Sequence, residues 1–377
     1  AATHISNTHP EWILNIPTAT GTSILDPGKV VVRQYVLSII TDVVRRYDID
    51  GIVMDDYFYV EGITTQDAAT FAAEPRGFTN LGNWRRDNVN LLIRGIYDSV
   101  NAVKPWVKFG MSPRGIWKDG VPPGISGNDN YSTIYCDAVA WLQGRYIDYF
   151  SPQLYWRIGG AQDYSLLEPW WASQLNGRIY CPSLAAYKIG QYDFGGAGEV
   201  ARQIRFYRDK GNAHGNVPFT AHNLTDNLGG IGDTRKYDLF RYPALVPVFP
   251  WKDTLRPNPP RGIQYAQVGG TGPAAILWDL PITAGDGDSA SRYAVYRFDH
   301  TPALPAELSD PRNLLAVLAQ RAYAPPTPPS GGTYSYVVTA LDRNFNEGEP
   351  SNILQISVPP APILASPVNG IIAVPES

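Results

Sequence analysis

Cysteine, methionine, basic runs and long apolar runs are all scarce in this sequence. Its 377 residues include two cysteines and two methionines, and 31 basic residues against 35 acidic ones give a formal net charge of −4. No run of five basic residues occurs, so nucleic acid is not an expected partner. No stretch of 18 apolar residues occurs either, so we expect no membrane-spanning segment.

The two cysteines, Cys136 and Cys181, have neither the spacing of metal ligands nor the number needed for a disulfide framework. One bridge and two free thiols both fit the sequence, and we expect free thiols. A Gly-rich phosphate loop is also absent, so we expect neither a nucleotide cofactor nor a metal. The sequence begins without methionine and shows no signal peptide, which we interpret as a processed or cut N-terminus.

By contrast, polar aromatic residues are abundant. The chain has 10 Trp and 23 Tyr but only 12 Phe. A tyrosine or tryptophan ring offers an apolar face together with a hydrogen-bonding group, which suits sugar-binding surfaces as well as protein cores. Hydrophobic residues make up 44% of the chain, enough for two or three folded domains.

The first two thirds of the chain alternate short apolar runs with amphipathic ones, which predicts parallel βα units. Strands are expected at 49–56, 106–112, 147–155, 178–186 and 215–221. Helices are expected at 28–46, 85–104, 132–143, 163–175 and 197–210. In the first helix the expected core face carries Val32, Val36, Ile39, Ile40, Val43 and Val44. Because polar and aromatic residues gather where the strands end, the pattern favours a (β/α) barrel.

The composition changes after this region. Residues 245–262 are rich in proline and predict a linker. Alternating apolar runs over 263–358 predict an all-β sandwich whose late strands look like those of a fibronectin type III domain. Residues 359–377 are again proline-rich and predict a tail or the start of a further domain. The barrel-type domain is therefore expected to occupy residues 1–244.

Residues 47–60, YDIDGIVMDDYFYV, carry the clearest signal for chemistry. Successive residues on a strand point to opposite faces, so Asp55 and Asp56 are expected to diverge. One carboxylate would face the open end of the barrel while the other contacts a loop or an arginine. The alternative is that both only cap the following loop.

Six segments resemble, in order, successive motifs of the glycosyl-hydrolase-like family 10. They are DGIVMDDYFY (50–59), NWRRDNVN (83–90), KFGMSPRGIW (108–117), IDYFSPQLYW (147–156), EPWWA (168–172) and AAYKIG (185–190). The resemblance covers roughly residues 9–225. It implies a (β/α)8 TIM-barrel-type domain in a secreted, periplasmic or cell-envelope protein of bacteria. It also implies hydrolysis of glycan strands, including peptidoglycan without its peptides.

The resemblance further implies three βα units before the Asp55 strand, because residues 4–14 are similar to the segment just ahead of that strand. Five strands in place of eight would leave an open edge and an apolar face. We therefore expect a truncated or processed chain, or a second polypeptide that completes the barrel. The Asp55 strand is also similar to the chitinase family 18 pattern DGxDxDxE, but Tyr57 replaces the glutamic acid, so that family's mechanism does not transfer unchanged.

For catalysis we predict Asp55 first and Asp56 second, because glycoside hydrolysis usually needs two carboxyl groups. If the substrate carries an N-acetyl group, the sugar itself can act as nucleophile and one carboxyl group suffices. Four other acidic residues in loops are expected to be ordinary solvated charges: Asp119, Asp129, Asp163 and Glu168. The residues predicted to bind substrate are Tyr57, Tyr59, Ser112, Arg114, Gln153, Tyr155, Trp156, Tyr187, His222 and Asn223.

Some of these predictions have specific content. Gln153 and Tyr155 are expected to share a strand face and either hydrogen-bond a sugar or hold the catalytic aspartate. Arg114 stands where the family more often has an aromatic residue, which makes it a candidate specificity residue. One of Trp170 and Trp171 is expected to pack the helix against the barrel.

A further group, Arg85, Arg86 and Asn88, lies at the start of a helix and is expected either to orient Asp56 or to face solvent. The predicted function is hydrolysis of an envelope or extracellular polysaccharide. The alternatives are a non-catalytic carbohydrate-binding protein and a scaffold dominated by the sandwich.

Overall fold

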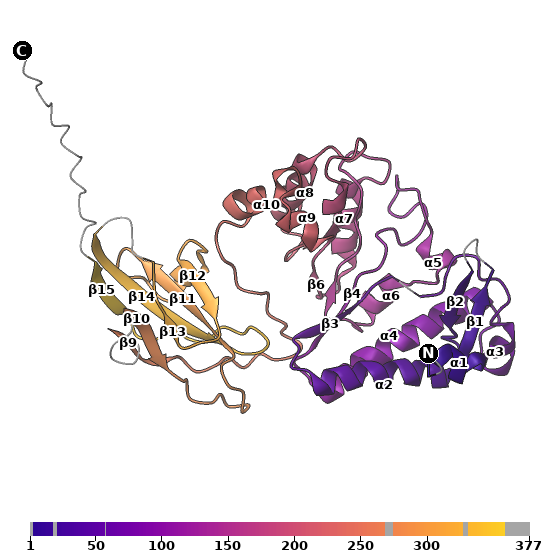
Figure 1. Ribbon diagram of the computed structural model, residues 1–377, viewed down its shortest axis with the longest axis horizontal. Coiled ribbons are helices and arrows are strands. Elements are labelled where there is room, and N and C mark those ends of the chain that lie inside the picture. The colour runs from indigo at the N-terminus through magenta and orange to yellow at the C-terminus, as the bar shows by residue number, and fades with distance from the viewer. Residues whose placement is uncertain (1–2, 18–20, 57, 268–273, 327–330, 359–377) are drawn as a thin grey trace, which may run out of the picture. The chain divides into compact units, whose positions relative to one another are not determined.

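The computed structural model describes residues 3–17, 21–56, 58–267, 274–326 and 331–358 (Figure 1). The chain forms two compact units. The first contains Ala1–Arg241 and Phe249–Lys252, and the second contains Tyr242–Val248 and Asp253–Ser377.

A parallel sheet organises the first unit. Its strands β3 (Gly51–Met54), β4 (Lys108–Met111), β5 (Tyr149–Phe150) and β6 (Ile179–Tyr180) pair in chain order. A second parallel pair follows, β7 (Ser183–Leu184) with β8 (Val217–Pro218), and isolated parallel bridges link Arg114 to Gln153 and Gln153 to Ser183. The five predicted strands are therefore present, with the fourth divided into β6 and β7. Strands that neighbour one another in chain order are typical of a (β/α) barrel.

Helices follow the strands, as the pattern predicts. The longer ones are α2 (Val30–Arg46), α4 (Leu81–Val103), α7 (Tyr164–Gln174) and α8 (Ala197–Lys210). Figure 1 shows α2 and α4 side by side, and they pack against each other. The shorter elements of this unit are α1 (Ile5–Thr8), a 3-10 turn (Pro10–Trp12), the antiparallel pair β1 (Ile13–Ile16) and β2 (Thr22–Leu25), α3 (Ala68–Ala73), α5 (Asn130–Thr133), α6 (Ala138–Gln143), a 3-10 turn (Ala186–Lys188), α9 (Ala221–Thr225), a 3-10 turn (Leu228–Gly230), α10 (Ile231–Thr234) and a π turn (Arg235–Leu239).

The core faces of the two long helices test the predicted periodicity. In α4 the positions Val89, Ile93, Ile96 and Val100 are buried as predicted. In α2 the predicted face is partly wrong, because Ile39 and Val43 are exposed and Arg33 is buried. The guanidinium of Arg33 donates to the carbonyl groups of Pro27 and Gly28, at 2.6 and 2.9 Å. Because these hydrogen bonds satisfy its guanidinium, Arg33 can be buried on the inner face of α2. A pattern of apolar residues does not predict this position.

The inner face of the parallel sheet is partly open. Val53, Val217 and Phe219 are 55%, 44% and 49% exposed. A parallel sheet normally has both faces covered. The expectation that further polypeptide completes a barrel over this face stays a prediction.

Four residues of the expected linker, Phe249–Lys252, belong to the first unit. Trp251 Nε1 donates to Oδ1 of Asp148 at 2.6 Å, and Lys252 Nζ lies 3.1 Å from Oδ2 of the same carboxylate. The guanidinium of Arg178 stacks on the Trp251 ring at 4.2 Å. Asp148 directly precedes β5, so Phe249–Lys252 is held at the amino end of the sheet, opposite the ends where the predicted site residues lie.

The second unit is a β-sandwich of two antiparallel sheets. One has the order β13 (Ala322–Tyr323), β10 (Ala274–Asp279), β9 (Arg261–Gln267). The other has the order β12 (Leu314–Leu318), β11 (Arg292–Phe298), β14 (Gly332–Leu341), β15 (Leu354–Val358), and a 3-10 turn spans Ala306–Ser309. This three-plus-four arrangement is that of a fibronectin type III-like domain, as the sequence predicts. Its core includes Trp278, Tyr293 and Tyr336.

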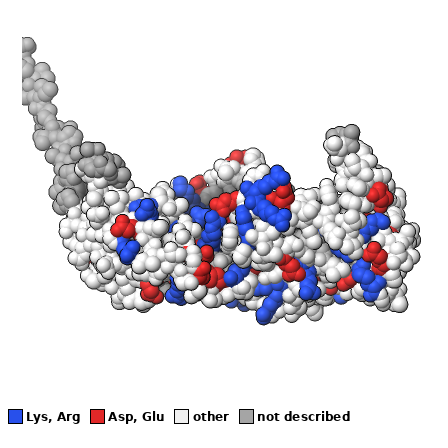
Figure 2. Space-filling model, turned by 90° about the horizontal axis from the view of Figure 1, so that it is seen from below, with Lys and Arg blue, Asp and Glu red and all other residues white. Residues whose placement is uncertain are grey.

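The state of the two cysteines agrees with the sequence analysis. Cys136 and Cys181 are free thiols, as expected, and burial raises the pKa of Cys181 to about 11. In the part of the chain that the structure describes, no helix is long and apolar enough to cross a membrane. Figure 2 shows lysine and arginine side chains interspersed with acidic ones on the face in view.

Candidate active site

Two cavities meet at the carboxyl ends of the parallel strands. Cavity A has a volume of about 420 Å³ and cavity B about 440 Å³. Asp56, Gln153 and Tyr155 line both cavities. Functional groups of (β/α) barrels collect at these strand ends. The shared wall between the two cavities is therefore the candidate active site.

Asp55 and Asp56 directly follow β3, whose last residue is Met54. Both line cavity B, and Asp56 also lines cavity A. The two side chains have different partners, because Asp55 accepts a hydrogen bond from Gln153 and Asp56 accepts one from Arg114. This agrees with the expectation that one of the two carboxylates contacts an arginine.

Gln153 holds Asp55 in place. Its Nε2 donates to Oδ1 of Asp55 at 2.7 Å and to the backbone oxygen of Ser112 at 3.0 Å. The backbone of Gln153 forms parallel bridges with Arg114 and Ser183 on either side. The amide is thus fixed by two neighbouring strand ends and fixes the carboxylate in turn.

Several neighbouring groups affect the pKa of Asp55. Burial raises the pKa of Asp55, and the neighbouring charge of Asp56 raises it further. Hydrogen bonds from the Asp56 backbone and from Gln153 lower the pKa, but the net direction is upward. A carboxyl group that keeps its proton to a higher pH than an ordinary aspartate suits a general acid.

Arg114 connects Asp56 to a second carboxylate. Its Nε donates to Oδ2 of Asp56 at 2.9 Å, and its terminal nitrogen donates to Oε1 of Glu61 at 2.8 Å. The Asp56 side chain is 13% exposed, whereas the Arg114 side chain is 38% exposed, so only the carboxylate of this ion pair is largely shielded from water. The guanidinium therefore stabilises negative charge on Asp56.

Tyr155 places a phenol group beside the two carboxyl groups. Its hydroxyl lies 3.2 Å from Oγ of Ser183, and burial raises the pKa of Tyr155 to about 12. The ring stacks on Phe219, with centroids 5.9 Å apart, and meets Tyr187 edge-on at 5.8 Å. The hydroxyl therefore stays protonated and can donate a hydrogen bond to a ligand.

The remaining predicted residues of this region line the cavities. Trp156 and Tyr187 line cavity A, and Ser112 lines cavity B. Gly115 forms part of the wall of cavity A, where a Cβ would lie 2.4 Å from the carbonyl oxygen of Gln153. Only glycine allows this approach of two backbone segments.

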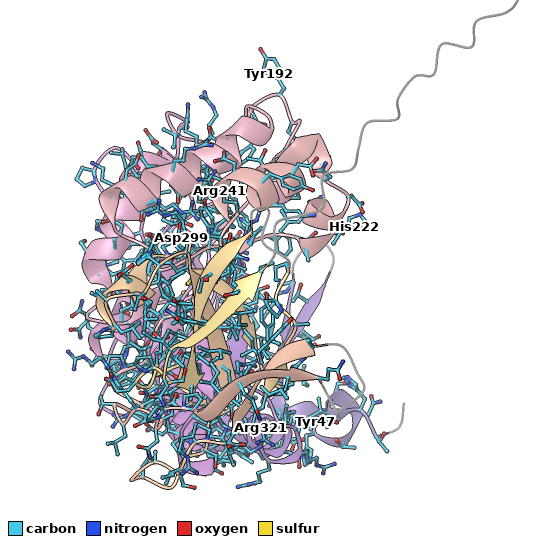
Figure 3. The ribbon with its side chains drawn as sticks, turned by 90° about the vertical axis from the view of Figure 1, so that its left-hand side faces the viewer. Tyr47, Tyr192, His222, Arg241, Asp299 and Arg321 are labelled. Carbon is cyan, nitrogen blue, oxygen red and sulfur yellow. The ribbon has the colours of Figure 1, made fainter. Side chains whose placement is uncertain are left out.

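Three predicted substrate contacts lie elsewhere, and Tyr57 lies outside the described residues. Tyr59 is only 1% exposed and its hydroxyl accepts a hydrogen bond from Asn88 at 2.9 Å, so it belongs to the core. His222 is on the surface helix α9, with its side chain 77% exposed and paired to Asp226 (Figure 3). Asn223 caps the same helix by accepting from Thr220. His222 and Asn223 do not line either cavity, because β8 ends at Pro218 and the chain turns into α9 at Ala221.

The other candidate carboxylates have structural partners. Asp129 and Asp163 cap helices α5 and α7, and Asp119 accepts a backbone hydrogen bond. Glu168 is buried, where Asn212 donates to it at 3.0 Å, and so is not the solvated charge that the sequence predicts. None of these four lines cavity A or B.

Three helical residues and two tryptophans also have defined contacts. Arg85 pairs with the buried Asp67, rather than with Asp56. Arg86 donates to the backbone of Tyr131, and Asn88 donates to Tyr59. Trp171 is the buried packing residue, whose Nε1 donates to the oxygen of Gly115 at 2.8 Å. Trp170 stacks on Trp117, with ring centroids 5.9 Å apart.

Sequence reasoning missed several residues of the site. Glu61 reaches Arg114, and Lys188, Asn128 and Gln162 line cavity A. Lys188 belongs to the AAYKIG segment, which is the signal that would have found it. Asn128 and Gln162 lie on irregular loops whose path no periodic pattern predicts.

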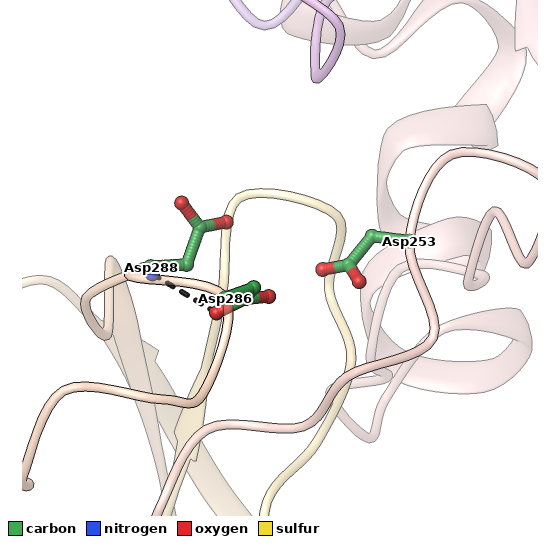
Figure 4. A group of neighbouring side chains, drawn as sticks. All are labelled: Asp253, Asp286 and Asp288. Atoms are coloured by element: carbon green, nitrogen blue, oxygen red, sulfur yellow. Dashed lines mark hydrogen bonds between the residues drawn. The ribbon is translucent and has the colours of Figure 1, made fainter.

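A cluster of three carboxylates lies in the second unit. Ligand oxygens of Asp253, Asp286 and Asp288 lie within 4.8 Å of one another (Figure 4). The backbone N–H of Asp288 donates to Oδ1 of Asp286 at 3.0 Å, and Asn346 donates to the Asp253 backbone. Burial and the two neighbouring charges raise the pKa of Asp288. Exposed acidic groups gather in this way without any ion, and we assign none here.

Comparison with known proteins identifies the family of this chain. The family model described as glycosyl hydrolase-like 10 matches residues 2–193. The chain is similar to the glycosyl hydrolase YngK of Bacillus subtilis, with 35% identity over 92% of this chain and 69% of that protein. It is similar to the glycosyl hydrolase DigH of Escherichia coli K12, with 34% identity over 48% of this chain and 43% of that protein.

A solved structure, the PgaB (BpsB) glycoside hydrolase domain of Bordetella bronchiseptica, is 14% identical and covers 56% of this chain and 63% of its own, with a TM-score of 0.41. The match to the E. coli relative covers less than half of that protein's length. The extent of the family match and the identity to the Bacillus protein agree with the motif order in the sequence. The chain belongs to the glycosyl hydrolase-like 10 family.

Proposed function

We propose that this protein is a glycoside hydrolase that cleaves a polysaccharide of the bacterial envelope or extracellular matrix, such as peptidoglycan glycan strands without peptides. The observation that carries the proposal is the Asp55–Asp56 pair, positioned by Gln153 and Arg114 between two cavities. Family membership and the names of the two relatives support the reaction class. A location in the envelope or outside the cell follows from such a substrate.

In the proposed reaction Asp55 is the general acid. Its raised pKa keeps the proton available, and the proton passes to the glycosidic oxygen as that bond breaks. Asp55 then carries the negative charge, which the amide of Gln153 stabilises through its hydrogen bond to Oδ1. Gln153 thus stabilises the charged form of Asp55 that proton transfer produces.

Asp56 acts on the sugar that remains. Its negative charge, held by Arg114, stabilises the positive charge that develops at the anomeric carbon. Water then adds to that carbon and gives its proton to the carboxylate pair, which restores the starting state. Cavities A and B would hold the sugars on either side of the broken bond, with Trp156 and Tyr187 offering apolar ring faces in cavity A.

Release of new reducing ends from peptide-free glycan strands tests the proposal. Asp55→Asn and Asp56→Asn are expected to reduce the rate by at least about 100-fold, the range seen when an acid–base group is removed. Asp98→Asn is the matched control, because Asp98 is an exposed residue paired with Arg94 on α4. Glycan binding without cleavage by the wild type and both variants would overturn the hydrolase and favour a carbohydrate-binding protein.

A further inference from the structure

We propose that Lys188 determines the substrate preference of cavity A by binding a carboxylate on the sugar there. This inference rests on the proposed function, because it assumes that cavity A holds a glycan. Lys188 lies in the 3-10 turn Ala186–Lys188, directly after β7. It lines cavity A together with Asp56 and Arg114, the other charged residues of that wall.

The charges of cavity A leave Lys188 unbalanced. Arg114 is occupied by Asp56 on one side and by Glu61 on the other. Among the residues that the structure describes, no carboxylate lies within ion-pair distance of Lys188. The positive charge of this lysine is therefore available to a ligand that enters the cavity.

The ammonium group is also held in place. Nζ of Lys188 donates to the backbone oxygen of Tyr155 at 3.0 Å. An ammonium group has three donors, so two remain for a ligand. The turn itself is anchored by Ala186 and Ile189, which are buried. A fixed donor loses little conformational entropy when it binds an anion.

The position of this tether sets where the anion would lie. Tyr155 lines both cavities, beside Asp55 and Asp56, and its backbone oxygen holds the ammonium. A carboxylate at Lys188 would therefore belong to a sugar in cavity A, the cavity that Lys188 lines. Two kinds of glycan carry such a group: those with a uronic acid, and those with a lactyl ether on an amino sugar.

Calorimetric titration of the whole chain tests the inference. The ligands are hyaluronan oligosaccharides for the uronic acid and peptide-free peptidoglycan oligosaccharides for the lactyl group, each beside its methyl ester. The wild type is expected to bind one of the two acids about tenfold more tightly than its ester, and the acid that shows this preference identifies the source. Equal affinity for acid and ester in both pairs overturns the inference without any variant.

Three variants then locate the effect. Lys188→Met is expected to bind the acid as weakly as the ester, whereas Lys188→Arg keeps the preference. Lys236→Met is the matched control, because Lys236 is an exposed lysine that lies over a tyrosine ring outside the cavity. A preference that survives in Lys188→Met overturns the role of this lysine.

The outcomes separate this inference from the proposed function. Preferential binding of the acid without release of reducing ends would leave the inference standing and overturn the hydrolase. Cleavage of acidic glycans and their esters at equal rates, with equal affinity, would leave the hydrolase standing and overturn the inference.

Discussion

Gln153 donates a 2.7 Å hydrogen bond to Asp55 across 98 positions of the sequence. The bond joins the end of β5 to the end of β3, with β4 between them in the sheet. It lowers the pKa of Asp55, against burial and the charge of Asp56, which raise it. The amide therefore helps to set the pH range in which the proposed acid works.

Replacement of this amide is expected to move the pH profile. In Gln153→Leu the pKa of Asp55 rises, because the group that stabilised its charged form is gone. A general acid is active while protonated, so activity is lost as pH rises through its pKa. The alkaline limb of the profile of kcat/KM should therefore shift to higher pH, while the maximum falls because Asp55 is less well oriented.

Gln143→Leu is the control for that experiment, since Gln143 makes a surface contact with the Gln174 backbone. Its pH profile should match the wild type. An alkaline limb that stays in place or moves to lower pH in Gln153→Leu would contradict the role of Asp55 as the acid.

Arg114 is expected to resist replacement by lysine. Its guanidinium contacts Asp56 and Glu61 through two different nitrogens. A lysine ammonium is a single point charge and does not span both carboxylates in this geometry. Arg114→Lys and Arg114→Met should both lower kcat by about tenfold or more, in line with the loss of a charged hydrogen bond of about 1.5–3 kcal/mol.

The readout is initial rate on saturating glycan, with Arg94→Lys as control, because Arg94 forms an exposed pair with Asp98. Full activity in Arg114→Lys would show that Asp56 needs only a nearby positive charge.

Much of this arrangement is visible in the sequence. The stripe of Val89, Ile93 and Ile96 predicts the core face of α4, because burial along a helix repeats every three to four residues. The Asp55–Asp56 pair is predictable because it follows an apolar strand. The local sequence pattern is sufficient to predict the buried face of a helix or strand that packs against a single core.

Other features depend on contacts that sequence distance hides. The partners of Arg85 and Arg114 are Asp67 and Asp56, and no spacing rule connects them. His222 ends the last predicted strand, yet the chain turns into α9 there and leaves its side chain in solvent. A strand-end rule fails here because the strand ends at Pro218, four residues before His222.

Gly115 gives a test of the wall between the cavities. A Cβ at this position would lie 2.4 Å from the Gln153 oxygen and 2.9 Å from atoms of Leu154 and Trp156. In Gly115→Ala the segment after β5 must move, which displaces Gln153 from Asp55. We expect kcat/KM to fall by about 100-fold, since a displacement of about 1 Å can cost that much.

Gly120→Ala serves as its control, because a Cβ there meets nothing within 4 Å, although its backbone φ of 75° adds strain. Thermal unfolding of both variants distinguishes a local shift from a loss of fold. Wild-type activity in Gly115→Ala would show that the wall tolerates the added methyl group.

The buried pair of Asp148 and Lys252 predicts where the first unit ends. Lys252 Nζ contacts this carboxylate and the backbone oxygens of Pro105 and Val107, at 3.0 Å each. The side chains of the pair are 1% and 0% exposed. Removing one partner of such a pair leaves an unpaired buried charge and costs about 3–5 kcal/mol. Lys252→Met should therefore lower the free energy of unfolding of the first unit by that amount.

A truncation gives the same result by a different route. A chain of residues 1–252 should unfold at a clearly higher temperature than one of residues 1–244, because only the longer chain keeps Trp251 and Lys252 on Asp148. Lys104→Met is the control, since its ammonium makes only an exposed contact with the Tyr47 backbone. Equal melting temperatures for the two chains would mean that Phe249–Lys252 adds nothing to the first unit. Because Asp148 precedes β5, loss of this anchor is also expected to loosen the strand that carries Gln153 and Tyr155.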